Sequence, residues 1–113
     1  MINRTSNTKK EGTMEFLVYK EGGLYVGVCL TFDIVEEGSH PVELLESIKE
    51  AAELHLETVI KNDLSDELLN RYAPEEYWTR YFKALKERAS SSSEGSSILV
   101  VSPYYRSLTA KVA

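Results

Sequence analysis

Three side chains in this sequence have the types that nucleophilic or metal chemistry uses: Cys29, His40 and His55. A cysteine nucleophile needs a histidine base and a group that orients the base, and the spacing of these residues does not support that arrangement. A zinc site needs about four cysteine, histidine or carboxylate ligands, and there is no second cysteine or neighbouring pair of histidines. We interpret Cys29 as a buried strand residue, His40 as a helix cap and His55 as a partly buried structural histidine, and expect no metal or other cofactor.

Carboxylate clusters offer a second kind of chemistry, because they bind magnesium and support nuclease reactions. Such a site would need acids converging from the first strand, the main helix and the last strand of the domain. The first strand offers only Glu15, residues 98–101 offer none, and the helix glutamates fall on the solvent side. We therefore expect no catalytic residues and no enzymatic activity, and a metal-dependent nuclease is a remote alternative.

Length and composition favour one globular domain. The chain has 113 residues, of which 42% are hydrophobic and 27% charged, values typical of such domains. No secretory signal or membrane span is recognisable, and the single cysteine fits a reducing compartment, so we expect a cytoplasmic protein. Residues 1–13 are polar and predict a disordered tail. Residues 14–113 predict one domain that carries a helical insert (62–89) and a serine-rich connector (90–97).

Three short strands open the predicted domain. Residues 15–19 are rich in aromatic and β-branched side chains, and residues 24–30 alternate between apolar and other side chains, as strands do. Gly22 and Gly23 lie between them and suit a tight hairpin turn. Residues 32–35 predict a third strand, which residues 36–38 close.

A long helix is predicted from Pro41 to about Asn62. Proline suits the first helical position, because its missing N–H would have no partner there. Apolar residues recur at helical spacing and predict the buried stripe, namely Leu45, Ile48, Ala52, Leu56 and Val59, which Leu44 and Ala51 widen. Residues 64–89 predict more helix, broken at Ala73–Pro74, because the residue before a proline disfavours helix.

Residues 98–101 predict the fourth strand. They are apolar throughout, which favours burial on both faces, whereas Pro103 favours an edge for the later part of the strand. A right-handed crossover through the helix would make this strand parallel to the first. We therefore predict an α+β fold of order β-β-β-α-(α)-β, with an antiparallel three-stranded meander, a fourth strand parallel to the first, and the main helix on one face.

The charge is concentrated in the middle of the chain. Residues 14–61 contain ten acidic residues and three lysines, a net charge of −7. This segment would repel nucleic acid phosphates and could attract a basic partner. The alternative interpretation is an ordinary solvated surface.

The part of segment 64–89 that follows the break at Ala73–Pro74 carries an aromatic face composed of Tyr77, Trp78, Tyr81 and Phe82. Aromatic residues are enriched at protein interfaces, so this face is a candidate oligomer interface. Packing within the monomer, over one end of the sheet, is the other interpretation.

Residues 14–61 resemble the HicB-like antitoxin domain, a truncated ribonuclease H-like fold. The similarity lies in the apolar strand 16–19, the glycine turn and strand 22–26, the acidic stretch 29–38 that ends in glycine, and the glutamate-rich helix 41–56. Residues 98–101 are similar to the strand that completes that domain. His40 stands where the family usually has Thr or Ser, residues 62–97 are longer and more helical than the usual connector, and no DNA-binding domain resembling those of family members follows.

The resemblance implies a non-catalytic domain that binds and neutralises a small basic RNA-cleaving toxin of the HicA type. It also implies homo-oligomers formed through the sheet edge or the helices, at least a dimer, and we expect neither direct nucleic acid binding nor membrane association. We place the toxin-binding surface on the third strand and early helix, with Asp33, Glu36, Glu37 and Glu43 as its acids. The alternative function is an orphan homo-oligomeric structural or regulatory protein without a toxin.

Overall fold

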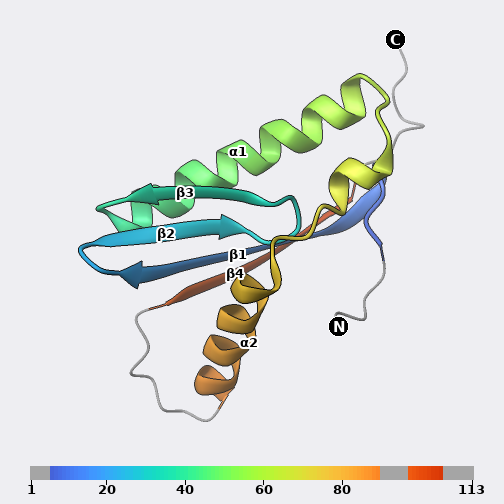
Figure 1. Cartoon of the computed structure of the whole chain (residues 1–113). Helices are drawn as coiled ribbons and strands as arrows, with labels where there is room; N and C mark the ends of the chain where they lie inside the picture. The colour runs from blue at the N-terminus through green and yellow to red at the C-terminus, as the bar shows by residue number, and fades with distance from the viewer. Residues whose placement is uncertain (1–5, 90–96, 106–113) are drawn as a thin grey trace.

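Seven elements follow one another along the part of the chain that the computed structural model describes, residues 6–89 and 97–105. They are β1 (Glu11–Glu21), β2 (Leu24–Cys29), β3 (Ile34–Gly38), α1 (Pro41–Lys61), the 3₁₀ helix η1 (Asp66–Leu69), α2 (Glu75–Ala89) and β4 (Ile98–Tyr105). The four strands form one sheet of order β3-β2-β1-β4, with α1 on one side of it and α2 on the other (Figure 1). The α+β class and the antiparallel meander are confirmed.

The predicted direction of the fourth strand is wrong, because β4 runs antiparallel to β1. Just before α2, the N–H of Ala73 donates to the carbonyl of Leu30, which directly follows β2. Further along α2, Arg80 approaches Glu21 at the opposite end of the sheet (Nη2–Oε2, 3.7 Å). The prediction of a parallel fourth strand considered α1 as the only helix between β1 and β4. Because α2 carries the chain back along the sheet, β4 enters beside Val18 and runs the other way.

The turn between β1 and β2 takes the form that the two glycines predict. Glu21 pairs with Leu24, which leaves Gly22 and Gly23 as a two-residue loop. Gly22 has φ +66° and Gly23 does not have a positive φ, as a type II′ turn requires. This turn fixes which residues of β1 and β2 pair with each other. Along the paired strands, alternate β1 residues then face α1 and α2.

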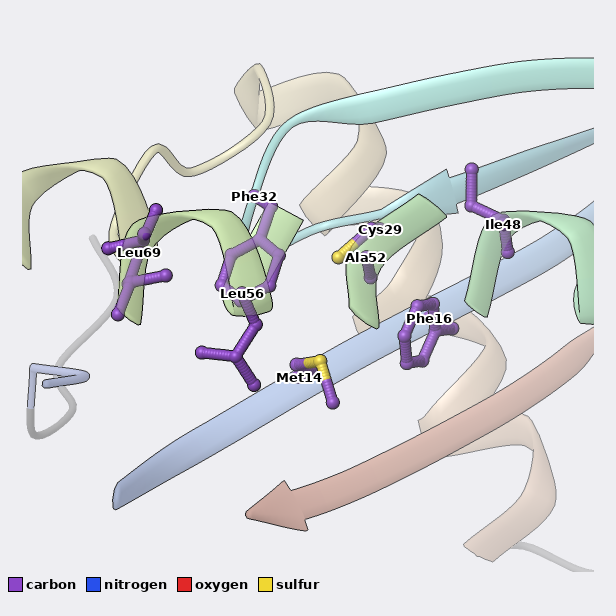
Figure 2. Packing of buried hydrophobic residues seen from close by; sticks show 9 residues of the cluster. Met14, Phe16, Cys29, Phe32, Ile48, Ala52, Leu56 and Leu69 are labelled. Atoms are coloured by element: carbon purple, nitrogen blue, oxygen red, sulfur yellow. The ribbon is translucent and has the colours of Figure 1, made fainter. Parts of the chain in front are cut away.

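The first core layer lies between the sheet and α1. Figure 2 shows Met14 and Phe16 of β1 directed toward the buried side of the helix. The buried residues of α1 are Leu44, Ile48, Ala52, Leu56 and Val59. All five belong to the predicted stripe, in which Leu44 was expected to widen the buried side, whereas Leu45 is only partly buried. Gly27 lets α1 approach β2 closely, because a Cβ there would lie 3.0 Å from Cγ of Leu44.

The second core layer lies between the sheet and α2. It consists of the alternate sheet residues and the inner side of the helix with the segment before it, namely Leu17, Tyr19, Val26, Val28, Leu30, Ala73, Trp78 and Tyr81. The two layers share the sheet, so β1 and β2 are buried on both faces. This accounts for the nearly continuous burial of residues 16–19 and 26–30.

The N-terminal segment was predicted to be disordered through residue 13, and this is wrong from Ser6 onward. Asn7 is buried (3% exposed). Its Nδ2 donates to the carbonyls of Thr13 (3.1 Å) and Leu69 (3.0 Å), and its Oδ1 accepts from the N–H of Thr13 (3.0 Å). The Lys9 ammonium donates to Asp66 (2.7 Å). This hydrogen bond is the main reason that the pKa of Lys9 is raised. Together these contacts attach residues 7–9 to η1.

The predicted helical insert is confirmed as η1 and α2, separated at Ala73–Pro74. Ser65 is the N-cap of η1, and its hydroxyl accepts from the N–H of Glu67. The serine-rich connector lies outside the described residues except for Ser97. β4 is an edge strand with Val101 exposed, so the expected burial on both faces is wrong, whereas the edge position of Pro103 is confirmed.

Candidate functional site

Cys29 lies at the end of β2, fully buried in the α1 core layer (Figure 2). Burial raises the pKa of its thiol to about 12, although backbone hydrogen bonds from Phe32 and Thr31 act in the opposite direction. A thiol with this pKa remains protonated near neutral pH, and the thiolate is the nucleophilic form. The geometry therefore supports the structural interpretation of Cys29.

The two histidines do not form a site with this thiol. His55 Nε2 lies 2.6 Å from the carbonyl of Leu68, and its ring packs against that of Phe32 with centroids 4.9 Å apart. Because a carbonyl accepts, Nε2 carries the proton, and His55 links α1 to η1. His40 occupies the predicted N-cap position of α1, but its side chain makes no capping hydrogen bond.

Ionisation of Cys29 gives a prediction for the pH dependence of stability. The unfolded thiol ionises near its ordinary pKa of 9.0 and the folded thiol near 12. Between these values the unfolded state binds fewer protons, so the free energy of unfolding should fall as pH rises, by up to about 1.4 kcal/mol per pH unit. Urea unfolding across this range should show a shallower decline in Cys29→Ala than in the wild type. Parallel declines would contradict the assignment.

The acidic residues do not form a metal site in the described ranges 6–89 and 97–105, where no group of three or more His, Cys, Asp or Glu side chains is arranged to hold an ion. Within the same ranges, no helix is both long and apolar enough to cross a bilayer.

The four acids assigned to partner binding lie around β3 but do not form one cluster. Asp33 is exposed in the turn before β3, with φ +59°. Glu36 points to the α1 side, where its Oε1 accepts a hydrogen bond from Ser47 (2.8 Å). Glu37 points to the α2 side, because successive strand residues face opposite ways. Glu43 is exposed in the first turn of α1.

The outer side of α1 carries a more regular acidic surface. Its glutamates recur at alternating steps of three and four residues and form what we call the outer stripe, consisting of Glu43, Glu46, Glu50, Glu53 and Glu57. All five are exposed, on the side opposite the buried residues. Glu46, Glu50 and Glu53, with Lys49, line a shallow hollow of about 370 Å³. The sequence pattern had indicated only the solvent-facing side of a helix, although the spacing was visible.

The aromatic face of α2 packs mainly within the chain. Trp78 and Tyr81 are buried against the sheet, and Tyr77 is partly buried. The Trp78 ring meets those of Tyr81 and Phe82 at centroid distances of 5.8 Å each. Of the four predicted interface residues, Phe82 is the one that remains largely accessible (48% exposed).

Comparisons with known proteins do not assign a relative. No protein-family model, no curated protein and no solved structure matches this chain.

Proposed function

We propose that this protein is a non-catalytic protein-binding module of the HicB-like antitoxin type, which neutralises a small, basic, RNA-cleaving toxin in the cytoplasm. The observation that carries the proposal is the acidic surface of β3 and α1. Residues 14–61 have a net charge of −7, and most of their acids lie on exposed positions of these two elements. Of the four residues that line the hollow on the outer stripe, Lys49 is the one with a positive charge.

A surface of this kind suits a basic protein partner for electrostatic reasons. Charge complementarity raises the association rate and selects against partners of like charge. The same surface repels the phosphates of nucleic acid. The module would therefore bind the toxin rather than the toxin's RNA substrate, and its binding should weaken as salt rises.

The fold agrees with the proposal in one respect and departs from it in another. The strand order β3-β2-β1-β4, with α1 on one face, is compatible with a truncated ribonuclease H-like sheet. The antiparallel β4 is not the arrangement that the resemblance implies. Support for the proposal therefore comes from residues 14–61 and their surface charge, and not from β4.

The test is to isolate the tagged protein from its native cells, identify any stoichiometric partner by mass spectrometry and assay that partner for RNase activity. We expect a small basic RNase that this chain silences. In the double variant Glu36→Lys/Glu37→Lys, affinity for it should fall by about a hundredfold at low salt, because two attractive charges become repulsive.

The matched control is Glu75→Lys/Glu76→Lys, which makes the same charge change at exposed positions of α2, on the other side of the sheet. We expect it to retain most of the affinity. Equal losses in the two double variants would indicate a general charge effect and contradict the placement on β3. A basic partner without RNase activity would contradict the antitoxin assignment.

The second candidate function is an orphan homo-oligomer, at least a dimer, with a structural or regulatory role. It is favoured by the exposed apolar side chains of Phe82 and Leu85 on α2 and of Val101 and Tyr105 on β4. Val101 and Tyr105 project on the α2 side of the sheet, because they pair with Glu15 and Glu11, which alternate with the residues facing α1.

Phe82→Glu tests this second candidate. If the wild type is a dimer through α2, the variant should sediment as a folded monomer that is destabilised by no more than about 2 kcal/mol, because the ring is half exposed in the single chain. Leu54→Glu is the control, since Leu54 is an exposed apolar residue on α1. A variant that dimerises like the wild type would exclude α2 as the interface.

A further inference from the structure

The sheet has two outer edges, and the direction of their peptide groups follows from one hydrogen bond. The N–H of Leu30 donates to the carbonyl of Glu15 (2.8 Å), so the peptide groups of Glu15 face β2. The N–H and C=O of a strand residue point to the same side, and this side alternates along the strand. Even-numbered residues of β1 therefore face β4, and odd-numbered residues of β2 face β3.

The register then assigns the outward groups on each edge strand. On β4, the even-numbered residues pair with even-numbered residues of β1, so Val101 and Pro103 direct their main chain outward. On β3, Ile34, Glu36 and Gly38 pair with the odd-numbered residues of β2. The N–H and C=O groups of Val35 and Glu37 therefore point away from the sheet.

The two edges differ in whether they can accept another strand. Pro103 lacks an N–H at a point where β4 would present one, which is a common way to block an edge. β3 contains no proline, and Val35 is 42% exposed. An extended segment of a partner can add to such an edge through main-chain hydrogen bonds.

Charge determines which segment suits the β3 edge. Two copies of β3 paired antiparallel would bring Glu36 and Glu37 of each copy close to those of the other, and like charges opposite one another are destabilising. Asp33 adds a further negative charge at the start of the strand. A strand with lysine or arginine at the facing positions would instead be attracted.

We infer that the free edge of β3 takes up a basic β-strand of the partner, which extends the sheet beyond Val35 and Glu37. The inference rests on the proposed function, because it describes how that same acidic surface binds its partner. It differs from binding by surface charge alone in requiring the outward main-chain groups of β3.

The experiment uses three end-blocked, fluorescent peptides of seven residues on the full chain at low salt. The first alternates lysine with valine, the second has the same sequence with every internal peptide nitrogen methylated, and the third alternates glutamate with valine. The first and second have equal charge, but the second has no internal N–H to donate to β3 on either side of the strand. The third tests the sign of the charge. Binding is measured by fluorescence anisotropy, and amide exchange by NMR.

We expect the lysine–valine peptide to bind at least ten times more tightly than the N-methylated peptide, because only the first can donate main-chain hydrogen bonds to the outward carbonyls of β3. Exchange of the Val35 and Glu37 amides should slow when it binds. Val35→Pro, which removes one outward N–H, should weaken binding about tenfold, whereas Val35→Thr keeps the N–H and should change it less than about twofold.

Equal binding of the two lysine peptides, or unchanged exchange at Val35 and Glu37, would overturn strand addition while leaving binding by surface charge intact. Equal binding of the glutamate peptide would overturn the charge argument. Absence of binding by any peptide would overturn the inference, whereas the proposed function is decided separately by the co-purified partner. The exchange measurement uses the wild-type chain, so the test does not depend on Val35→Pro folding.

Discussion

Replacing Trp78 with alanine is expected to lower the free energy of unfolding by about 3–5 kcal/mol. Trp78 is 3% exposed and is one of the largest side chains between α2 and the sheet. Its removal would leave a cavity beneath α2 and separate the helix from the buried face of β1 and β2. Since small domains are stable by only about 5–15 kcal/mol, the variant should be marginally folded, as measured by urea unfolding.

The control for Trp78 is Phe82→Ala on the same helix, where the ring is 48% exposed. We expect this variant to lose less than about 1.5 kcal/mol, because much less apolar surface is buried there. If Trp78→Ala instead unfolded like the wild type and changed only the oligomeric state, Trp78 would be an interface residue, and its burial within the chain would be contradicted.

The second large effect is expected for Asn7→Ala, which should lower the free energy of unfolding by about 2–4 kcal/mol. The Asn7 amide accepts from the N–H of Thr13 and donates to the carbonyls of Thr13 and Leu69. Alanine would leave these main-chain groups without their hydrogen-bond partner. Each buried polar group that loses its partner lowers the free energy of unfolding by about 1–3 kcal/mol. The loss would be measured by thermal and urea unfolding.

Thr8→Ala is the matched control for Asn7, because it changes the neighbouring residue. The Thr8 hydroxyl accepts from the N–H groups of Lys10 and Glu11 in an exposed turn, where water can replace it. We expect a loss below about 1 kcal/mol. Equal losses at positions 7 and 8 would mean that the buried amide of Asn7 does not attach the N-terminal segment to η1.

The acidic candidate surface could be predicted only in part from the sequence. Glutamates are exposed unless they are paired, so the accessibility of Glu37 and of the outer stripe follows from residue type and helical spacing. The opposite directions of Glu36 and Glu37 were not predicted, because the sequence pattern ended the third strand at residue 35, whereas β3 extends from Ile34 to Gly38. The free edge of β3 could not be predicted from the sequence, because it depends on β4 pairing with β1 rather than with β3.

The aromatic face of α2 illustrates a second limit of sequence patterns. A row of aromatic residues on a helix has the same spacing whether it meets the sheet of its own chain or another subunit. The direction of α2 across the sheet buries Trp78 and Tyr81 and leaves Phe82 outside. The pattern identified the apolar side of the helix, and the tertiary structure determined what covers it.

The sequence by itself determined the local elements. Two glycines specified the β1–β2 turn, Pro41 the start of α1, apolar spacing the buried side of α1, and Pro74 the break before α2. Only the tertiary structure decided the antiparallel direction of β4 and the burial of Asn7. The physical reason is that turns, caps and periodicity act between residues a few positions apart. The direction of β4 depends on where α2 packs, and the contacts of Asn7 reach Leu69 and Asn70, which lie far along the chain.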